Sequence, residues 1–233
     1  MRLLPEAQVD WPDAVRIIRS CYPPIDLFED IADPADWALI IAAEQKTNPR
    51  LMETIGNIDL IPENRRVAGP GASLLMAPFT HVSTDRPSRF SDGSFGVLYV
   101  GRMFETALFE TMHHHARFMA DTAQVAGWTS QFRELITNVT ATLGDAMVLQ
   151  STNPVMSPDD YTAGQAVGAA TRAAGGEGIV YPSVRDPGSA CVALFYPDLA
   201  SAPIQARHLD YHWSRSRVDF YRDATSRAVF QVA

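Results

Sequence analysis

Three residues with chemically useful side chains lie close together between Pro87 and Phe118: Arg89, Tyr99 and Glu110. A guanidinium group presents a planar fork of donors that matches phosphate oxygens, and a tyrosine ring can stack on a planar ligand. Glu110 lies in an apolar helical segment, where a carboxylate is costly to bury without a partner, so a functional role is favoured. The structural alternatives are a surface arginine in a loop and a tyrosine of the core.

Other candidate residues lie in two further places. Ser183 follows a predicted strand in the segment GIVYPSVR, so its hydroxyl is either a ligand contact or that of a turn serine. A serine nucleophile is a weaker alternative, because no Gly-x-Ser-x-Gly elbow surrounds it. His113, His114 and His115 cannot hold one metal ion together, because successive helical residues point about 100° apart. We therefore expect no metal site.

The ordered set of Arg89, Tyr99, Glu110 and the segment 178–185 resembles the RES-domain family, which is named for its Arg, Glu and Ser. The resemblance covers roughly residues 72–200. Members are bacterial toxins that act on NAD⁺ and are usually encoded beside an antitoxin. The resemblance implies an α+β, ADP-ribosyltransferase-like fold of the diphtheria-toxin type. It also implies NAD⁺ as substrate and a cognate helix-turn-helix antitoxin of the Xre type as partner.

The resemblance assigns roles to individual residues. Glu110, Arg89 and Tyr99 are the expected catalytic residues. The expected contacts to NAD⁺ are made by Arg89, Tyr99, Ser183, His81 and Thr80. In such an enzyme a carboxylate near the ribose stabilises the oxocarbenium-like transition state while the bond to nicotinamide breaks.

Two classes of acceptor for ADP-ribose agree with the resemblance. Transfer to a protein side chain gives mono-ADP-ribosylation, and transfer to water or phosphate makes the enzyme an NAD⁺ glycohydrolase or phosphorylase. We favour the protein acceptor for two reasons. Residues 1–60 are expected to form a helical extension before the family core, and the sequence departs from the family at one place, which is described next.

The sequence departs from the family in an expected strand at residues 73–82. Related sequences often carry an Arg or a His that faces the nucleotide there, and the matching positions in this chain are Thr80 and His81. We expect His81 to take that role, or an arginine from elsewhere in the chain. The candidates are Arg65, Arg66 and Arg86. The missing arginine also favours an alternative, a non-catalytic binding module that retains the fold.

Composition narrows the class of protein. The net charge is −8, from 27 acidic and 19 basic residues, and Lys46 is the one lysine. Without a basic block, the chain is a poor nucleic-acid binder. The apolar run at 37–43 is too short to span a bilayer. No secretory signal is recognisable at the start of the sequence, so we expect Cys21 and Cys191 to be free thiols in a reducing cytoplasm.

The spacing of apolar residues, together with helix-capping and turn residues, predicts the helices and strands that must position these side chains. Residues 1–60 are expected to form a helical extension, and residues 61–233 the catalytic core. The expected helices cover residues 10–20, 35–47, 49–56, 103–117 and 161–174. The expected strands cover residues 73–82, 95–100, 136–140, 178–181 and 190–196, followed by a hairpin of 203–211 and 218–232. Small residues in the helix 161–174 predict close packing against another element.

Overall fold

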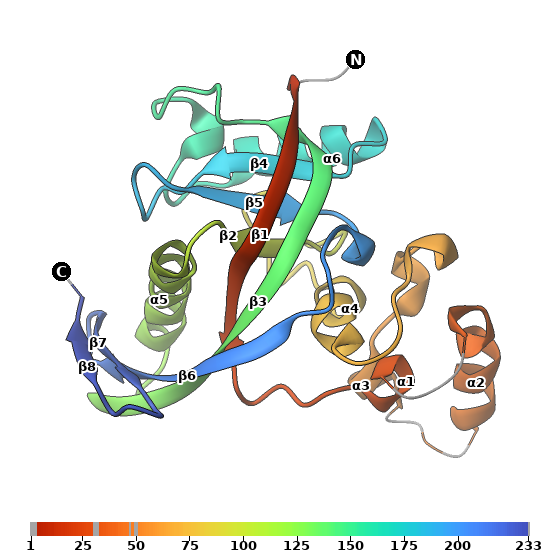
Figure 1. The fold of residues 1–233 in the computed structure, drawn as a ribbon, viewed down its shortest axis with the longest axis horizontal. Coiled ribbons are helices and arrows are strands. Elements are labelled where there is room, and N and C mark those ends of the chain that lie inside the picture. Colours follow the sequence, from red (N-terminus) through yellow and green to blue (C-terminus); the bar gives the residue numbers. More distant parts are fainter. Residues whose placement is uncertain (1–3, 30–32, 47, 49–50, 233) are drawn as a thin grey trace.

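Two long antiparallel strands form the centre of the fold in the computed structural model, which describes residues 4–29, 33–46, 48 and 51–232. Strand β1 (Glu6–Arg19) pairs with strand β3 (Gly127–Asp145) along its whole length. Figure 1 shows the two strands side by side across the middle of the molecule. The start of the chain is therefore part of the sheet.

The prediction of a helix at residues 10–20 is wrong, since this segment lies in β1. Asp10-Trp11-Pro12 has the composition of a helix start, but the register shifts between Trp11 and Ala14, and Pro12 falls in that bulge. A proline is tolerated in a bulge because no ladder hydrogen bond is lost. Beyond the bulge, the buried β-branched residues Val15 and Ile17 alternate with the half-buried Arg16 and Ile18, which is the period of a strand.

Three short strands close the sheet into a ring with β1 and β3. β2 (Leu98–Gly101), β5 (Ala190–Leu194) and β4 (Gly178–Pro182) pair antiparallel in that order, and β4 meets the end of β3 in a parallel pair. β1 contacts both β3 and β2, so the pairing β1-β2-β5-β4-β3 returns to β1. The predicted α+β class with mostly antiparallel strands is confirmed.

The C-terminal strands extend the sheet from the edge of β3 that lies opposite β1. β6 (Ile204–Trp213) pairs with β3, and β7 (Val218–Asp223) and β8 (Val229–Gln231) follow antiparallel. The predicted terminal hairpin is confirmed.

Short helices follow β1. These are α1 (Asp26–Glu29), α2 (Trp37–Glu44) and α3 (Leu51–Ile55). The helices predicted at 35–47 and 49–56 are confirmed in type, although residues 47, 49 and 50 lie outside the described part. Glu29 accepts hydrogen bonds from the amides of Gly71 and Ser73, so a remote carboxylate caps the helix that starts there.

That capped helix is α4 (Ala72–Thr80), and the strand predicted at 73–82 is therefore wrong. Leu75, Met76 and Phe79 are buried at helical spacing, whereas a strand would bury alternate residues. Pro78 lies in the last turn, where only one helical hydrogen bond is lost.

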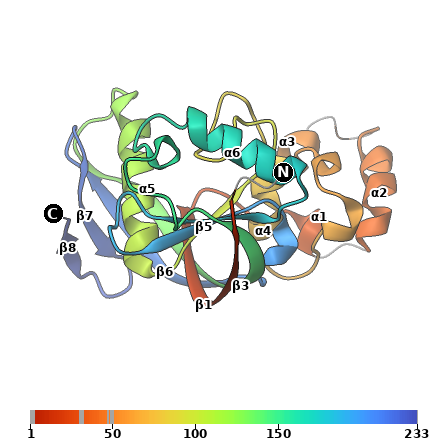
Figure 2. The same ribbon diagram turned by 90° about the horizontal axis from the view of Figure 1, so that it is seen from above.

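Two longer helices flank the ring. α5 (Phe104–Ala120) shares a buried apolar cluster with β1, β6 and β7, and α6 (Thr162–Ala173) belongs to a cluster with β4 and β5. Both helices, and the strands predicted beside them, are confirmed. In Figure 2, α5 and the α1–α3 group lie at opposite ends of the sheet, with α6 between them.

No helix in the described ranges is both long enough and apolar enough to cross a membrane. The division of the chain at about residue 60 stays a prediction, but the helical character expected for all of residues 1–60 is wrong over β1.

Candidate active site

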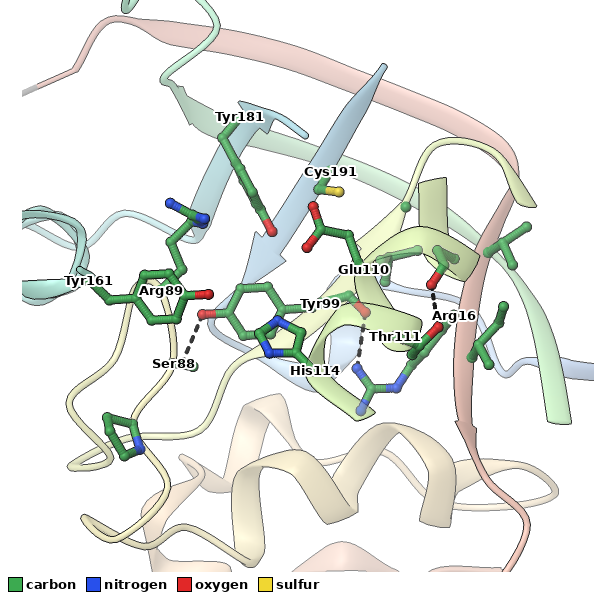
Figure 3. Close-up of a pocket in the computed structure, with 16 residues that line it drawn as sticks. Arg16, Ser88, Arg89, Tyr99, Glu110, Thr111, His114, Tyr161, Tyr181 and Cys191 are labelled. Atoms are coloured by element: carbon green, nitrogen blue, oxygen red, sulfur yellow. Dashed lines mark hydrogen bonds between the residues drawn. The ribbon is translucent and has the colours of Figure 1, made fainter. Parts of the chain in front are cut away.

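A cavity of about 330 Å³ opens between β1, β2, α5 and the loop that carries Arg89. Figure 3 shows the side chains that line it. Three of the predicted site residues, Arg89, Tyr99 and Glu110, are among them. Ser183, which we expected to join them around one dinucleotide, is not among the residues that line the cavity. The roles of all four residues stay predictions.

Arg89 is buried, with 7% of its surface exposed, and its partners are backbone atoms. Its Nη1 donates to the carbonyl oxygens of Val155 and Ser157, at 3.2 and 2.8 Å. The guanidinium carbon lies 4.7 Å from the centre of the Tyr161 ring, a cation–π contact. No ion pair to Arg89 exists among the described residues, so its charge is available to an anionic ligand.

Helix α6 holds the loop of Arg89 in place. A Cβ on Gly164 would lie 2.4 Å from the Arg89 carbonyl oxygen, and one on Gly168 would lie 2.0 Å from the Phe90 oxygen. Gln165 donates from Nε2 to the Ser88 carbonyl at 3.1 Å. The expected close packing by small residues of α6 is confirmed, and its partner is the loop that carries the arginine.

Tyr99 lies on β2, with its ring between Arg89 and Glu110 in Figure 3. Its phenol donates to Ser88 Oγ at 2.9 Å and accepts from the Phe90 amide at 3.0 Å. Burial raises the pKa of the Tyr99 phenol to about 12. The side chain is therefore a neutral, fixed aromatic wall of the cavity.

Glu110 lies on the cavity side of α5 and is half-buried. Its Oε1 accepts a 2.7 Å hydrogen bond from Ser183 Oγ. Ser183 in turn accepts from the amides of Arg185 and Asp186, at 3.2 and 3.1 Å. The Ser183 oxygen accepts from two amides, so its hydroxyl hydrogen is left to donate to the carboxylate. This hydrogen bond fixes the orientation of the Glu110 carboxylate. A direct contact of Ser183 with the dinucleotide stays a prediction.

Two further side chains lie beside Glu110 in Figure 3, the Cys191 thiol and the Tyr181 phenol. Burial raises the pKa of both groups, and the Glu110 carboxylate raises it further. Both are therefore uncharged, which leaves Glu110 as the one acidic side chain among the described residues that line the cavity. Both cysteines are free thiols, as expected.

The sequence analysis missed Arg16, which lines the same cavity from β1. Its Nη1 donates to the Tyr99 carbonyl at 3.0 Å, while its buried Nε has no partner. Burial lowers the pKa of Arg16 to about 10, and no carboxylate among the described residues pairs with it. A charged residue between Val15 and Ile17, which are both buried, was the available signal, but the helix predicted there concealed the alternation.

Thr80 and His81 lie at the end of α4, outside this cavity. Thr80 is buried and its Oγ1 lies 3.1 Å from His81 Nδ1. His81 and Arg86 line a second cavity of about 130 Å³, which shares Ser88 and Tyr99 with the first. Contacts of Thr80 and His81 with a dinucleotide stay a prediction.

Two of the arginines considered as replacements are engaged elsewhere. Arg65 forms ion pairs with Glu177 and Asp198, at 2.9 and 2.8 Å. Arg66 donates to the carbonyl oxygens of Ile58 and Ile61. Neither lines the cavity, so Arg16 is the second arginine beside Arg89.

Comparison with known proteins places the chain in a family. The model of the RES domain matches residues 64–214, and the chain belongs to the RES-domain family. The resemblance drawn from Arg89, Tyr99, Glu110 and Ser183 is thus confirmed. Arg16 lies before the matched residues.

The chain is also similar to an uncharacterised protein, y4oC, of Sinorhizobium fredii (strain NBRC 101917 / NGR234). The two are 25% identical over 210 residues, which cover 87% of this chain and 84% of that protein. Among solved structures, one match is a chain of the M. tuberculosis MbcT-MbcA toxin-antitoxin complex. It has a TM-score of 0.44 and 12% identity, and covers 87% of this chain and 86% of that one.

Proposed function

We propose that this protein is an NAD⁺-consuming toxin that cleaves the bond between nicotinamide and ribose and transfers ADP-ribose to a protein side chain. One observation carries the proposal. A carboxylate fixed by a serine shares a cavity with a neutral tyrosine ring and two arginines that form no ion pair in the described part of the chain. These are the groups that a bent dinucleotide with two phosphates and a cationic ring requires.

The two arginines are proposed to bind the pyrophosphate. Both are held by carbonyl oxygens, which orient a guanidinium without neutralising it. A cavity of about 330 Å³ is at the small end of the range for ligand sites, about 300–1,000 Å³. We therefore place the nicotinamide riboside half inside it, against Tyr99, and the adenosine half towards the entrance.

Glu110 is the proposed catalytic residue. When the C1′–N bond breaks, its electron pair leaves with nicotinamide, which becomes neutral, and positive charge develops on the ribose ring. A carboxylate held close to that ring stabilises the charge as it forms. The acceptor then supplies an electron pair to C1′ and gives up a proton, which we propose that the Glu110 carboxylate accepts.

The toxin role, the Xre-type helix-turn-helix antitoxin and the cytoplasmic location follow from the family resemblance and are part of this proposal. So is the ADP-ribosyltransferase-like arrangement of the core.

The experiment compares NAD⁺ cleavage by the wild type, Glu110→Gln and Glu105→Gln. Glu105 lies on the same helix but is exposed and outside the cavity, so it is the matched control. We expect Glu110→Gln to lower the rate by about 10²–10³-fold and Glu105→Gln to leave it unchanged. Equal activity of all three proteins would refute the proposal.

Labelled NAD⁺ incubated with a bacterial lysate separates the acceptors. Label that moves onto a protein band supports transfer. Release of free ADP-ribose or its phosphate alone would instead identify a glycohydrolase or phosphorylase. No cleavage by the wild type would point to the non-catalytic binding module.

A further inference from the structure

Helix α5 separates the candidate active site from a second depression. The residues at positions 107, 110, 111 and 114 face the catalytic cavity. The adjacent face of the helix lines a groove of about 630 Å³, closed on its other side by the start of β7 and by Val232. In Figure 1 this side of α5 faces the β7–β8 corner of the sheet. Helix α5 therefore contributes side chains to both the cavity and the groove.

The groove has an apolar lining and basic side chains. Phe109, Ala116 and Val232, which are half-buried, supply apolar surface, and the buried Met112 and Val218 form its floor. The charged groups that line it are the guanidinium groups of Arg117, Arg185 and Arg217, and no carboxylate is among the lining residues. In a chain with a net charge of −8, such a local excess of positive charge is unusual.

Two of these arginines are free to bind a partner. Arg117 and Arg217 are exposed, and neither forms an ion pair within the described residues. Arg185 is less free, since its Nη2 donates to Pro158 O at 2.6 Å and to His113 Nε2 at 2.8 Å, and forms an ion pair with Asp159 at 3.5 Å. Burial and the Arg185 charge lower the pKa of His113, which explains why the neutral imidazole accepts the bond from Arg185. The unpaired positive charge of the groove therefore comes from Arg117 and Arg217. The groove thus combines an apolar lining with two exposed, unpaired arginines at its rim.

The groove is connected to the candidate catalytic carboxylate by a short chain of contacts. The Arg185 amide donates to Ser183 Oγ, and Ser183 Oγ donates to Glu110. An occupant of the groove would therefore lie next to the reacting centre without covering it, because α5 stands between. That position suits a molecule that must be held while the cavity stays open to NAD⁺.

From this arrangement we infer that the groove between α5 and β7 docks an acidic, amphipathic segment of the acceptor protein. The inference rests on the proposed function with a protein acceptor. Carboxylates of the segment pair with Arg117 and Arg217, and its apolar side chains pack on Phe109 and Ala116, which are half-buried and line the groove. An antitoxin that only blocks the cavity would have no need of this surface.

The docking test uses two fluorescent peptides of equal length. One carries Glu and Leu at helical spacing, and the other carries Lys in place of every Glu. We expect the acidic peptide to bind and the basic one not to bind. We expect the double variant Arg117→Glu/Arg217→Glu to weaken binding about tenfold, and added salt to weaken it in the wild type. Arg215→Glu, an exposed arginine outside the groove, is the matched control.

The same proteins then separate the docking surface from the chemistry. We expect the double variant to cleave NAD⁺ at the wild-type rate without acceptor but to label lysate proteins several-fold more slowly. Equal binding of both peptides, or labelling unchanged in the double variant, would overturn the inference. If the wild type does not cleave NAD⁺ at all, the proposed function fails, whereas the peptide titration still decides on the surface. Single variants, Arg117→Gln and Arg217→Gln, repeat the comparison if the double variant is unfolded.

Discussion

The arginines of β6 and β7 and those of the candidate active-site cavity are held in opposite ways. Arg207 on β6 forms a bidentate pair with the buried Glu134, at 2.6 and 2.9 Å, and Arg222 on β7 pairs with Asp210. In the cavity, the hydrogen bonds that Arg16 and Arg89 donate within the described part of the chain go to backbone carbonyl oxygens. The first arrangement neutralises the charge and supports the fold, whereas the second preserves the charge for a ligand.

The largest effect on stability is expected for Arg207→Ala. Glu134 is 2% exposed, so the variant leaves a buried carboxylate without its partner. We expect a loss of about 3 kcal/mol in the free energy of unfolding, measured by urea titration, with an unchanged KM for NAD⁺. A raised KM together with unchanged stability would show that Arg207 does not support the fold.

For Arg16→Ala we expect a changed KM for NAD⁺ rather than a large loss of stability. If Arg16 binds the pyrophosphate as proposed, loss of that charge-assisted contact should raise KM for NAD⁺ by about 10- to 100-fold, with a smaller effect on kcat. Arg222→Ala is the control, because its guanidinium pairs with Asp210 away from the cavity. The distinction between the two groups fails if both variants change KM equally.

Arg89 can be displaced without removing its charge. In Gly164→Ala the new Cβ would lie 2.4 Å from the Arg89 carbonyl oxygen, so the loop or the helix must shift. We expect destabilisation of about 1–3 kcal/mol and a several-fold higher KM. Ala169→Gly, at an exposed position of the same helix, should cost about 1 kcal/mol and leave KM unchanged. Thermal unfolding and steady-state kinetics measure both quantities.

A smaller, pH-dependent effect is expected for Tyr99→Phe. The pKa of Tyr99 is raised to about 12 in the folded state, above the usual value of 10 in the unfolded chain. Its contribution to stability is therefore complete below pH 10 and is lost as the pH rises to 12, by at most about 1.4 kcal/mol per pH unit. The variant should be less stable than the wild type at pH 8, and the difference should shrink by pH 11. A difference independent of pH would contradict this.

The site residues that could be predicted from the sequence lie on consecutive elements of the chain. Arg89, Tyr99 and Glu110 lie on a loop, a strand and a helix that follow one another, and each element had a clear period or breaker. Their relation to Ser183 came from the family resemblance. The order of types between residues 95 and 231 was also predictable, because turn residues separate strongly patterned segments.

The two errors have a common physical cause. In β1 and α4 the apolar residues fit two periods, and tertiary packing decided between them. A proline in each segment was misinterpreted, as a helix start in Pro12 and as a strand bulge in Pro78. Since β1 carries Arg16, the error in secondary structure hid one of the two cavity arginines.

The most direct test is a crystal structure of Glu110→Gln with carba-NAD⁺, a dinucleotide whose ribose–nicotinamide bond cannot be hydrolysed. The account predicts the nicotinamide ring against Tyr99 and the pyrophosphate oxygens about 2.8 Å from the guanidinium groups of Arg16 and Arg89. A dinucleotide bound elsewhere on the molecule, or one whose phosphates contact neither arginine, would contradict it.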